Sequence, residues 1–215
     1  DPARDRFILS KGHAAPAFYQ VLAKRGFFPE SLLDNYGEDG SLFGGHPPAK
    51  GIPGVEAATG SLGHGLPIGV GISIASRIRG LKSRTFVLVS DGECNEGSIW
   101  EAAMLAAAQK LDRLAVVVDF NKWQATGRSV EIMALEPLAE KWRSFGWSAC
   151  EVDGHNMEEL EWVLASVPDG TGKPVAVVAH TVKGKGVSFM EDDNNWHYRI
   201  PTLAEVEAAK KELGL

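Results

Sequence analysis

The second half of the chain alternates between short apolar runs and segments with helical periodicity. Thr85–Ser90 and Leu114–Phe120 are rich in β-branched residues and have the length of strands, whereas segment 98–110 between them is rich in alanine, with apolar positions all round a helix. This order predicts a βαβ unit. The alternation continues with a helix over 137–145, a strand over 147–152, a helix over 157–167, a strand over 174–182 and a helix after Thr202.

Local capping signals support two of these helices. Asn156 stands at the N-cap position of segment 157–167, and Thr202 with Glu205 forms the pattern of a capping box. Alternating strands and helices predict an α/β fold, in which a mostly parallel sheet carries helices on both faces. In such sheets ligands bind at the carboxyl ends of the strands.

The first half of the chain is less regular. Segments 13–25 and 67–79 have helical periodicity, and region 37–65 between them is dense in glycine and proline. Long loops inside a compact domain usually carry function. No internal repeat or composition break divides the chain, so we expect one domain over 1–215. Its first residue is Asp rather than Met, and we expect a further N-terminal segment to precede it.

Composition and charge narrow the range of functions. A chain of 215 residues that is 44% hydrophobic and 23% charged can bury a core. Its net charge of −6 comes without charged blocks, which gives no electrostatic footprint for nucleic acid. No apolar stretch approaches the roughly 20 residues of a membrane span, and Cys94 and Cys150 lack the spacing of a metal site. We therefore expect a cytoplasmic protein that binds neither nucleic acid nor membrane.

Two oxygen-bearing side chains follow the two strand-like runs of the βαβ unit. Asp91 and Asn121 each come directly after one run, and the carbonyl of Trp123 could add a third oxygen. Mg²⁺ prefers a few protein oxygens shared with water and phosphate. Gly92 allows a phosphate to approach the backbone, and a helix beginning near 96–98 adds its N-terminal dipole. Asp-Gly after a strand is also a common turn. The prediction of a metal-bound diphosphate therefore depends on Asn121, which follows the second strand at the position that matches Asp91 after the first.

Glycines and histidines supply the other candidate groups. Segment 60–65 (GSLGHG) precedes the helix over 67–79 and suits close backbone approach to a ligand, although a flexible connector has the same composition. The P-loop pattern GxxxxGK[ST] is absent, which excludes that class of triphosphatase. A single histidine is usually a packed or surface residue, but four of the six lie in loops or beside glycines and indicate a polar cleft: His13, His46, His64 and His197.

Several motifs occur in a fixed order over nearly the whole chain. They are Leu9-Ser10-Lys11-Gly12-His13, Gly45-His46-Pro47, Pro53-Gly54-Val55-Glu56 with Thr59-Gly60-Ser61-Leu62-Gly63-His64-Gly65, Asp91-Gly92-Glu93 with Glu96-Gly97-Ser98, Asp119-Phe120-Asn121-Lys122, and Lys183-Gly184-Lys185-Gly186-Val187 with Trp196-His197. Together they closely resemble the thiamine diphosphate-binding N-terminal module of transketolases. The chain departs from the family pattern at Ser90, at Phe120, and at Tyr198-Arg199 after the Trp-His pair, where a small residue is usual; this last difference could alter substrate fit.

The resemblance implies a role for each matching position. Mg²⁺, or Ca²⁺ or Mn²⁺ in its place, would be held by Asp91, Asn121 and the Trp123 carbonyl. His13, His46 and His197 would face the reacting ketose, and Glu96 would lie between protomers in a proton-linked pair with a carboxylate of the neighbouring chain. The positions implied to contact thiamine diphosphate are His13, Gly60, Ser61, Leu62, Gly92, Glu93, Asn121 and His197.

The resemblance also implies a reaction and a partner. The thiazolium C2 carbanion of the cofactor attacks a ketose carbonyl, the C2–C3 bond breaks, and a two-carbon glycolaldehyde unit passes to an aldose, both sugars commonly being phosphates. The family activates its cofactor with a glutamate of a second α/β module, which the 33 residues after Val182 are too few to encode. We therefore expect one subunit of a split transketolase, inactive alone, that joins a separate C-terminal subunit carrying the pyrimidine-binding module in an α2β2 heterotetramer.

Three alternatives remain open from the sequence. 1-Deoxyxylulose-5-phosphate synthase shares the cofactor and a similar glycine loop, but the short segment between this loop and Asp91 and the Leu-Ser-Lys-Gly-His motif favour transketolase. A specialised split enzyme could act on a branched or sulfonated sugar in catabolism or biosynthesis. A non-catalytic scaffold subunit could keep the same fold, although the intact Asp91, Asn121, His13 and His197 disfavour that role.

Overall fold

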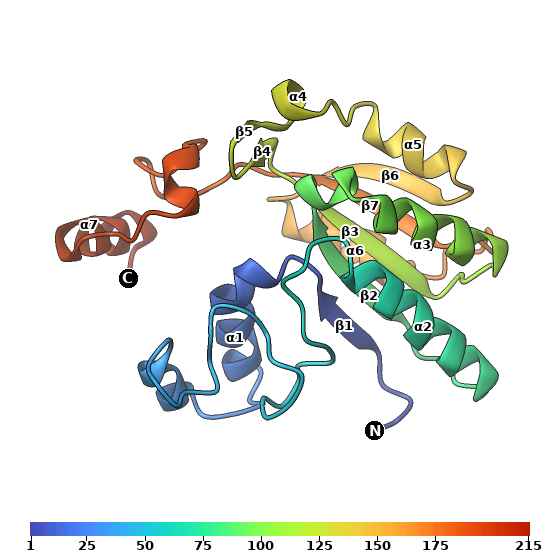
Figure 1. The fold of residues 1–215 in the computed structure, drawn as a ribbon, viewed down its shortest axis with the longest axis horizontal. Helices are drawn as coiled ribbons and strands as arrows, with labels where there is room; N and C mark the ends of the chain where they lie inside the picture. The colour runs from blue at the N-terminus through green and yellow to red at the C-terminus, as the bar shows by residue number, and fades with distance from the viewer.

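Five parallel strands form the sheet at the centre of the molecule (Figure 1). The computed structural model describes residues 1–215. The strand order across the sheet is β1 (Arg6–Leu9), β2 (Thr85–Ser90), β3 (Leu114–Phe120), β7 (Val175–His180) and β6 (Ser148–Asp153). Every neighbouring pair in this sheet is parallel. The α/β fold predicted from the sequence is therefore confirmed.

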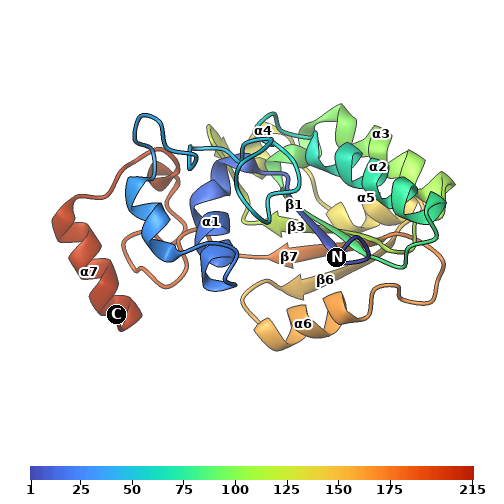
Figure 2. The ribbon, with the colours of Figure 1, turned by 90° about the horizontal axis from the view of Figure 1, so that it is seen from below.

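Helices cover both faces of the sheet. α2 (Gly65–Ile78), α3 (Gly97–Ala108) and α5 (Leu138–Ser144) lie on one face and α6 (Met157–Ala165) on the other (Figure 2). α1 (Ala15–Lys24) stands beside the sheet, and α7 (Leu203–Leu213) extends away from it (Figure 1). The short elements are α4 (Ser129–Ile132), the antiparallel hairpin of β4 (Trp123–Gln124) and β5 (Gly127–Arg128), and 3-10 turns at Gly12–Ala14, Glu30–Asn35, Gly92–Asn95 and Asn194–His197. None of the helices combines the length and the apolarity that crossing a bilayer requires.

The predicted helix caps form as expected. The Asn156 side chain accepts a hydrogen bond from the Glu159 N–H over 3.2 Å, and both bonds of the capping box between Thr202 and Glu205 are present. Strand β1 was not predicted, because four residues are too few to show a periodicity. This strand exists through tertiary pairing with β2, since a short strand is stable only where a neighbour satisfies its backbone groups.

The largest hydrophobic cluster holds 22 buried residues and lies between the sheet and helices α2, α3 and α5. Alternate residues of β3 point to opposite faces, so that Val116 and Val118 join this cluster while Ala115 joins the smaller cluster beneath α6. Gly69 of α2 lies against β2, where an added Cβ would come within 2.5 Å of a Val87 methyl carbon. This close packing holds β2 and β3, the strands that carry the candidate metal ligands, in a rigid frame.

The strand register brings the carboxyl ends of three strands to one edge of the sheet. Ser90, the last residue of β2, is paired with Asp119 of β3, and Phe120 is paired with His180, the last residue of β7. The residues that follow these strands therefore emerge side by side. Asp91 and Asn121 are two of them, as the sequence predicted.

Candidate functional site

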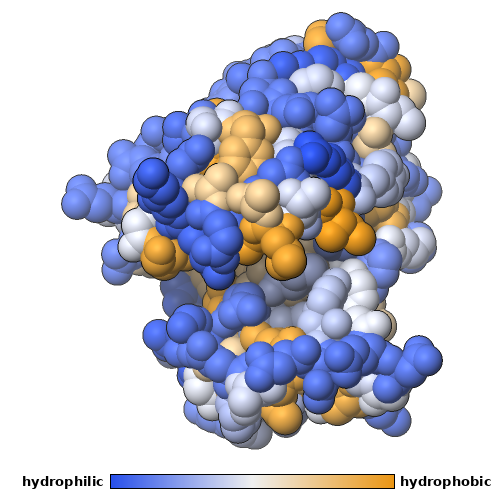
Figure 3. Space-filling view, turned by 90° about the vertical axis from the view of Figure 1, so that its left-hand side faces the viewer, coloured by the Kyte–Doolittle hydropathy of each residue, from blue (hydrophilic) through white to orange (hydrophobic).

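A cavity of about 850 Å³ lies at the carboxyl ends of the strands. Seen from the side of α7, the molecule is hollowed between an upper and a lower part, with hydrophilic and hydrophobic side chains around the hollow (Figure 3). Segments far apart in the sequence line the cavity: the loop before α1, the glycine loop before α2, the turn after β2, the β4–β5 hairpin and the region after β7. Its position agrees with the general location of ligand sites in parallel sheets.

Asp91 is fully buried beneath this cavity, and its chain neighbours Ser90 and Gly92 line it. One carboxylate oxygen accepts from the Gly92 N–H over 2.9 Å, and the other accepts from the Ser129 hydroxyl over 2.7 Å. Burial raises the pKa of Asp91 above its usual value, and the nearby Asp119 acts in the same direction, against the two hydrogen bonds. Both of these hydrogen-bond donors are neutral, and a divalent cation would supply a positive charge in direct contact with the carboxylate.

Asn121 and the hairpin continue the same polar edge. The Asn121 side-chain oxygen accepts from the Trp123 N–H over 2.9 Å, and Lys122 between them has a φ of +68° that turns the chain sharply. Asn121 and Trp123 both line the cavity. Two further polar atoms of cavity-lining residues, Asn95 Oδ1 and Gln124 Nε2, are buried without any partner. The residues present therefore fit a cation and a phosphate group, since unpaired polar atoms and a buried carboxylate are what such ligands satisfy.

No group of three or more His, Cys, Asp and Glu side chains gathers anywhere in the structure to hold a metal ion. The candidate ligands are instead one carboxylate, one carboxamide and one backbone carbonyl, from Asp91, Asn121 and Trp123. Oxygen-only sets of this kind suit Mg²⁺, Mn²⁺ or Ca²⁺ rather than Zn²⁺.

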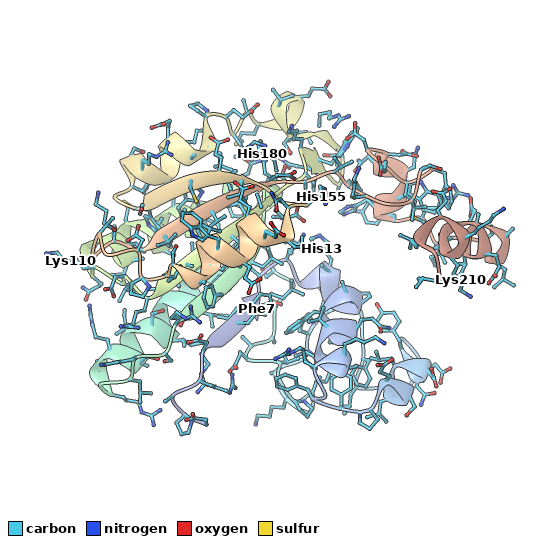
Figure 4. All side chains as sticks on the ribbon, turned by 180° about the vertical axis from the view of Figure 1, so that it is seen from behind. Phe7, His13, Lys110, His155, His180 and Lys210 are labelled. Carbon is cyan, nitrogen blue, oxygen red and sulfur yellow. The ribbon has the colours of Figure 1, made fainter.

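Three of the singled-out histidines come together in the cavity. His13, His46 and His197 all line it, and the rings of His13 and His197 lie 5.5 Å apart between their centroids. His46 packs against Gly60, where an added Cβ would come within 2.9 Å of its ring. Figure 4 shows His13 at the end of α1 that faces the sheet, with His155 at the neighbouring strand ends. The fourth histidine, His64, is exposed and lies outside the cavity lining.

The imidazole of His13 is held in its neutral form. Burial lowers its pKa from the usual 6.5 to about 4, and the nearby His197 and Lys11 act in the same direction. Burial and Lys183 also lower the pKa of His197. At neutral pH both rings can therefore donate one hydrogen bond and accept another, which suits the orientation of hydroxyl groups on a sugar.

We expect the His13 ring to titrate near pH 4, as measured by two-dimensional ¹H–¹⁵N NMR of the imidazole nitrogens. Because the folded-state pKa lies below 6.5, the unfolded chain binds this proton more readily. The contribution of the neutral His13 ring to folding stability is fully present above pH 6.5 and is lost as the pH falls through about 4. The ring is partly solvated, so we expect a change of only about 1 kcal/mol. In a His13→Gln variant this pH dependence should flatten; a ring that titrates near 6.5 would contradict the assignment.

Several cavity residues were not singled out from the sequence. Lys11 forms an ion pair with Asp119, which also accepts from the Thr181 hydroxyl. Burial acts to raise the pKa of Asp119, but the charge of Lys11 holds it below its usual value. Lys183 Nζ lies 3.1 Å from His197 Nδ1. Lysines inside the Ser-Lys-Gly-His and Lys-Gly-Lys-Gly motifs could have been predicted as phosphate-binding groups, because a cation beside glycines can approach a diphosphate closely.

His155 also lines the cavity without having been predicted. Its Nε2 accepts from the Val182 N–H over 2.8 Å, so the ring holds the start of the loop after β7. Nothing in its local sequence indicates this contact, because the two residues are brought together by the pairing of β6 with β7.

Glu93 lies differently from its predicted role in contacting the cofactor. Its side chain is fully buried, and one carboxylate oxygen accepts from the Ser10 hydroxyl over 2.6 Å and from the Gly63 N–H over 2.9 Å. The other oxygen accepts from the Ser90 N–H over 2.9 Å. Glu93 therefore ties three segments around the cavity together, and it does not itself line the cavity. Ser61 is exposed and lies outside the cavity lining, whereas Gly60 and Leu62 line it. Glu96, which was predicted to face a neighbouring chain, also lines the cavity.

Comparison with known proteins agrees with this architecture. The family model of the transketolase thiamine diphosphate-binding domain matches residues 2–215. The chain is 42% identical over 210 residues to one of the subunits of the apulose-4-phosphate transketolase of Phocaeicola vulgatus, covering 98% of this chain and 74% of that protein. It is 43% identical over 212 residues to a 6-deoxy-6-sulfo-D-fructose transketolase subunit of a Clostridium species, covering 99% and 77%.

A solved structure shows the same fold. The transketolase of Campylobacter jejuni superposes with a TM-score of 0.93 at 28% identity, over 100% of this chain and 35% of that one. The present chain thus spans about a third of the length of that transketolase. Its fold and cavity define a diphosphate-binding α/β module. The chain belongs to the transketolase thiamine diphosphate-binding domain family.

Proposed function

We propose that this chain, as one subunit of a two-chain transketolase, transfers a two-carbon ketol unit from a ketose or ketose phosphate to an aldose or aldose phosphate. The observation that carries the proposal is a single cavity that joins the Asp91–Asn121 edge to His13, His46 and His197. When bound, thiamine diphosphate supplies the carbanion for the reaction. In this proposal the whole of residues 1–215 is one module that holds the diphosphate end of the cofactor with Mg²⁺.

The chain's own residues bind the anion and orient the sugar. Lys11 and Lys183 bring positive charge to the cavity, and the pKa of Lys183 is lowered by burial and by Lys11. A bound diphosphate would relieve this repulsion between like charges. The neutral rings of His13 and His197 are placed to exchange hydrogen bonds with hydroxyl groups of the ketose, since each ring can donate one bond and accept another.

The names of the relatives support a partner. Two proteins to which the chain is similar are each named as one of the subunits of an apulose-4-phosphate transketolase. By analogy, the present chain would work with a separate C-terminal subunit that carries the pyrimidine-binding module, in an α2β2 heterotetramer. Glu96, which lines the cavity, would then face the neighbouring chain. Both cysteines are free thiols, which supports the proposal of a cytoplasmic location.

A specialised sugar is favoured over the substrates of the pentose phosphate pathway. The relatives are named for apulose 4-phosphate and for a sulfonated sugar. Tyr198, which replaces the usual small residue, lines the cavity with its ring 4.7 Å from that of His197. A bulky phenol at this point changes the space available to a sugar, and this supports an altered substrate range.

The test is an assay of the chain purified with its co-expressed partner, thiamine diphosphate and Mg²⁺. Donors would include hydroxypyruvate, pyruvate and straight, branched and sulfonated ketoses. We expect ketol transfer from hydroxypyruvate and from at least one ketose, and no transfer by either chain without the other. Consumption of pyruvate with a triose phosphate would instead support a 1-deoxyxylulose-5-phosphate synthase, and tight cofactor binding without any turnover would support a scaffold role.

A further inference from the structure

Two loops that line the cavity are joined by three side chains. The β4–β5 hairpin contributes Trp123 and Arg128, and segment 182–198 contributes Asp192. The Arg128 guanidinium donates to both carboxylate oxygens of Asp192, over 2.8 and 2.5 Å, and the Trp123 indole N–H donates to one of them over 2.8 Å. The guanidinium also stacks on the Trp123 ring at 3.7 Å from its centroid. We call these three side chains the Asp192 clasp.

Asp192 also closes its own loop. Its backbone N–H donates to the carbonyl of Lys183 over 2.8 Å, and its φ of +57° makes the turn possible. Gly184 permits this closure, because an added Cβ there would clash with the Met190 carbonyl group. The clasp is therefore connected to Lys183 through one hydrogen bond.

A second contact joins the hairpin to the same segment. The Asn194 side-chain amide donates to the Ala125 carbonyl over 3.1 Å, at the start of the turn that ends at His197. Lys183 and His197 line the cavity, whereas Arg128 and Asp192 lie outside its lining. Arg128 and Asp192 can therefore affect a ligand only through the positions of the two loops that they join.

We propose that the Asp192 clasp is a positioning device that holds segment 182–198 against the hairpin, so that Lys183 and His197 face the candidate diphosphate site. The role of the Asp192 clasp in diphosphate binding rests on the function proposed above. Its role in holding segment 182–198 does not depend on that function. Arg128 and Asp192 are positioning residues, because neither of them lines the cavity.

The chain offers a matched control for an ordinary surface ion pair. Arg84 donates to Asp5 through two nitrogens, over 2.9 and 2.6 Å, with side chains 30% and 40% exposed. Arg128 and Asp192 are 32% and 52% exposed. The Arg84–Asp5 pair joins the starts of β1 and β2, at the opposite end of the strands from the cavity. Exposed pairs of this kind usually contribute little to stability.

Limited trypsin digestion of the full chain tests the holding of the segment. Lys183 and Lys185 provide cleavage sites inside it. We expect Asp192→Ala and Arg128→Ala each to raise the rate of cleavage at these lysines about tenfold, since local opening governs proteolysis of a folded protein. The double variant should be no faster than either single variant, because both remove the same interaction. Asp5→Ala should leave these rates unchanged. Equal rates in wild type and Asp192→Ala would overturn the proposal.

Calorimetry with thiamine diphosphate and Mg²⁺, on the chain purified with its partner, tests the consequence for binding. We expect Asp192→Ala to weaken binding about five- to tenfold, with Asp5→Ala unchanged. Faster cleavage combined with unchanged affinity would overturn the positioning role. If the wild type itself failed to bind thiamine diphosphate, the proposed function would be wrong, and the trypsin rates alone would decide whether the clasp holds the segment.

Discussion

Replacement of Asp91 by alanine is expected to weaken Mg²⁺-dependent binding of thiamine diphosphate by at least about a hundredfold. The carboxylate is buried beneath the cavity and is the one charged side chain among the three predicted metal ligands. Without this carboxylate, no cation would bridge the diphosphate to the protein. The negative charge of Asp119 would then repel the diphosphate and weaken its binding. Calorimetry on the chain with its partner measures the effect. Unchanged affinity in Asp91→Ala would show that Asp91 is not a ligand of the metal ion.

The stability of the same variant separates binding from folding. Burial raises the pKa of Asp91 from its usual 3.8, so in the absence of a cation the folded state disfavours the charged form. The contribution of Asp91 to the free energy of unfolding is therefore most favourable below pH 3.8, and it is lost as the pH rises through the folded-state pKa. Removal of this charge offsets the loss of hydrogen bonds to Ser129 and Gly92. We expect a melting temperature within about 5 °C of wild type without metal.

Two variants serve as controls for Asp91→Ala. Asp91→Asn keeps the shape and an oxygen ligand but removes the charge, and it should give an intermediate loss of affinity. Asp39→Ala removes an exposed carboxylate in the long loop before α2 and should leave affinity unchanged. Thermal unfolding should then show that metal stabilises the wild type more than it stabilises Asp91→Ala.

Replacement of Glu93 by alanine is expected to lower the free energy of unfolding by about 2 kcal/mol. The buried carboxylate accepts from Ser10, Gly63 and Ser90, and its loss would leave two N–H groups and a hydroxyl without their partner. The Ser10 oxygen also accepts from the Gly65 N–H over 3.1 Å, which fixes its position beside Glu93. Burial raises the pKa of Glu93, and the relief of this buried charge keeps the loss below the sum of the three bonds.

Urea denaturation measures this prediction, with two matched variants. In Glu93→Gln the amide would place an N–H group against the donor of Gly63 or Ser90, so we expect a smaller but clear destabilisation, of about 1 kcal/mol. Glu101→Ala removes an exposed carboxylate of α3 and should stay within about 0.5 kcal/mol of wild type. A Glu93→Ala variant as stable as Glu101→Ala would show that the carboxylate does not hold the cavity segments together.

Local signals in the sequence were sufficient for much of the fold. The β-branched runs of β2 and β3, the cap at Asn156 and the capping box at Thr202 depend on residues within a few positions of one another. Asp91 and Asn121 could be placed together because parallel strands end at the same edge of a sheet. The direction of parallel strands was therefore enough to predict that the turns at Asp91 and Asn121 form one site.

The site also contains contacts that no local pattern specifies. Glu93 has the sequence context of a loop residue near a ligand, yet donors 83 and 30 residues away, from Ser10 and Gly63, engage its carboxylate inside the protein. The ion pair of Lys11 with Asp119 spans 108 residues. The chain alone thus determined its strands, its helix caps and the edge where its candidate ligands meet, because these follow from short-range periodicity and strand direction. Only the tertiary structure decided which charged groups face the cavity and which form hydrogen bonds or ion pairs that hold the cavity segments together. The reason is that these partners come from distant parts of the sequence and are placed beside each carboxylate only by the fold.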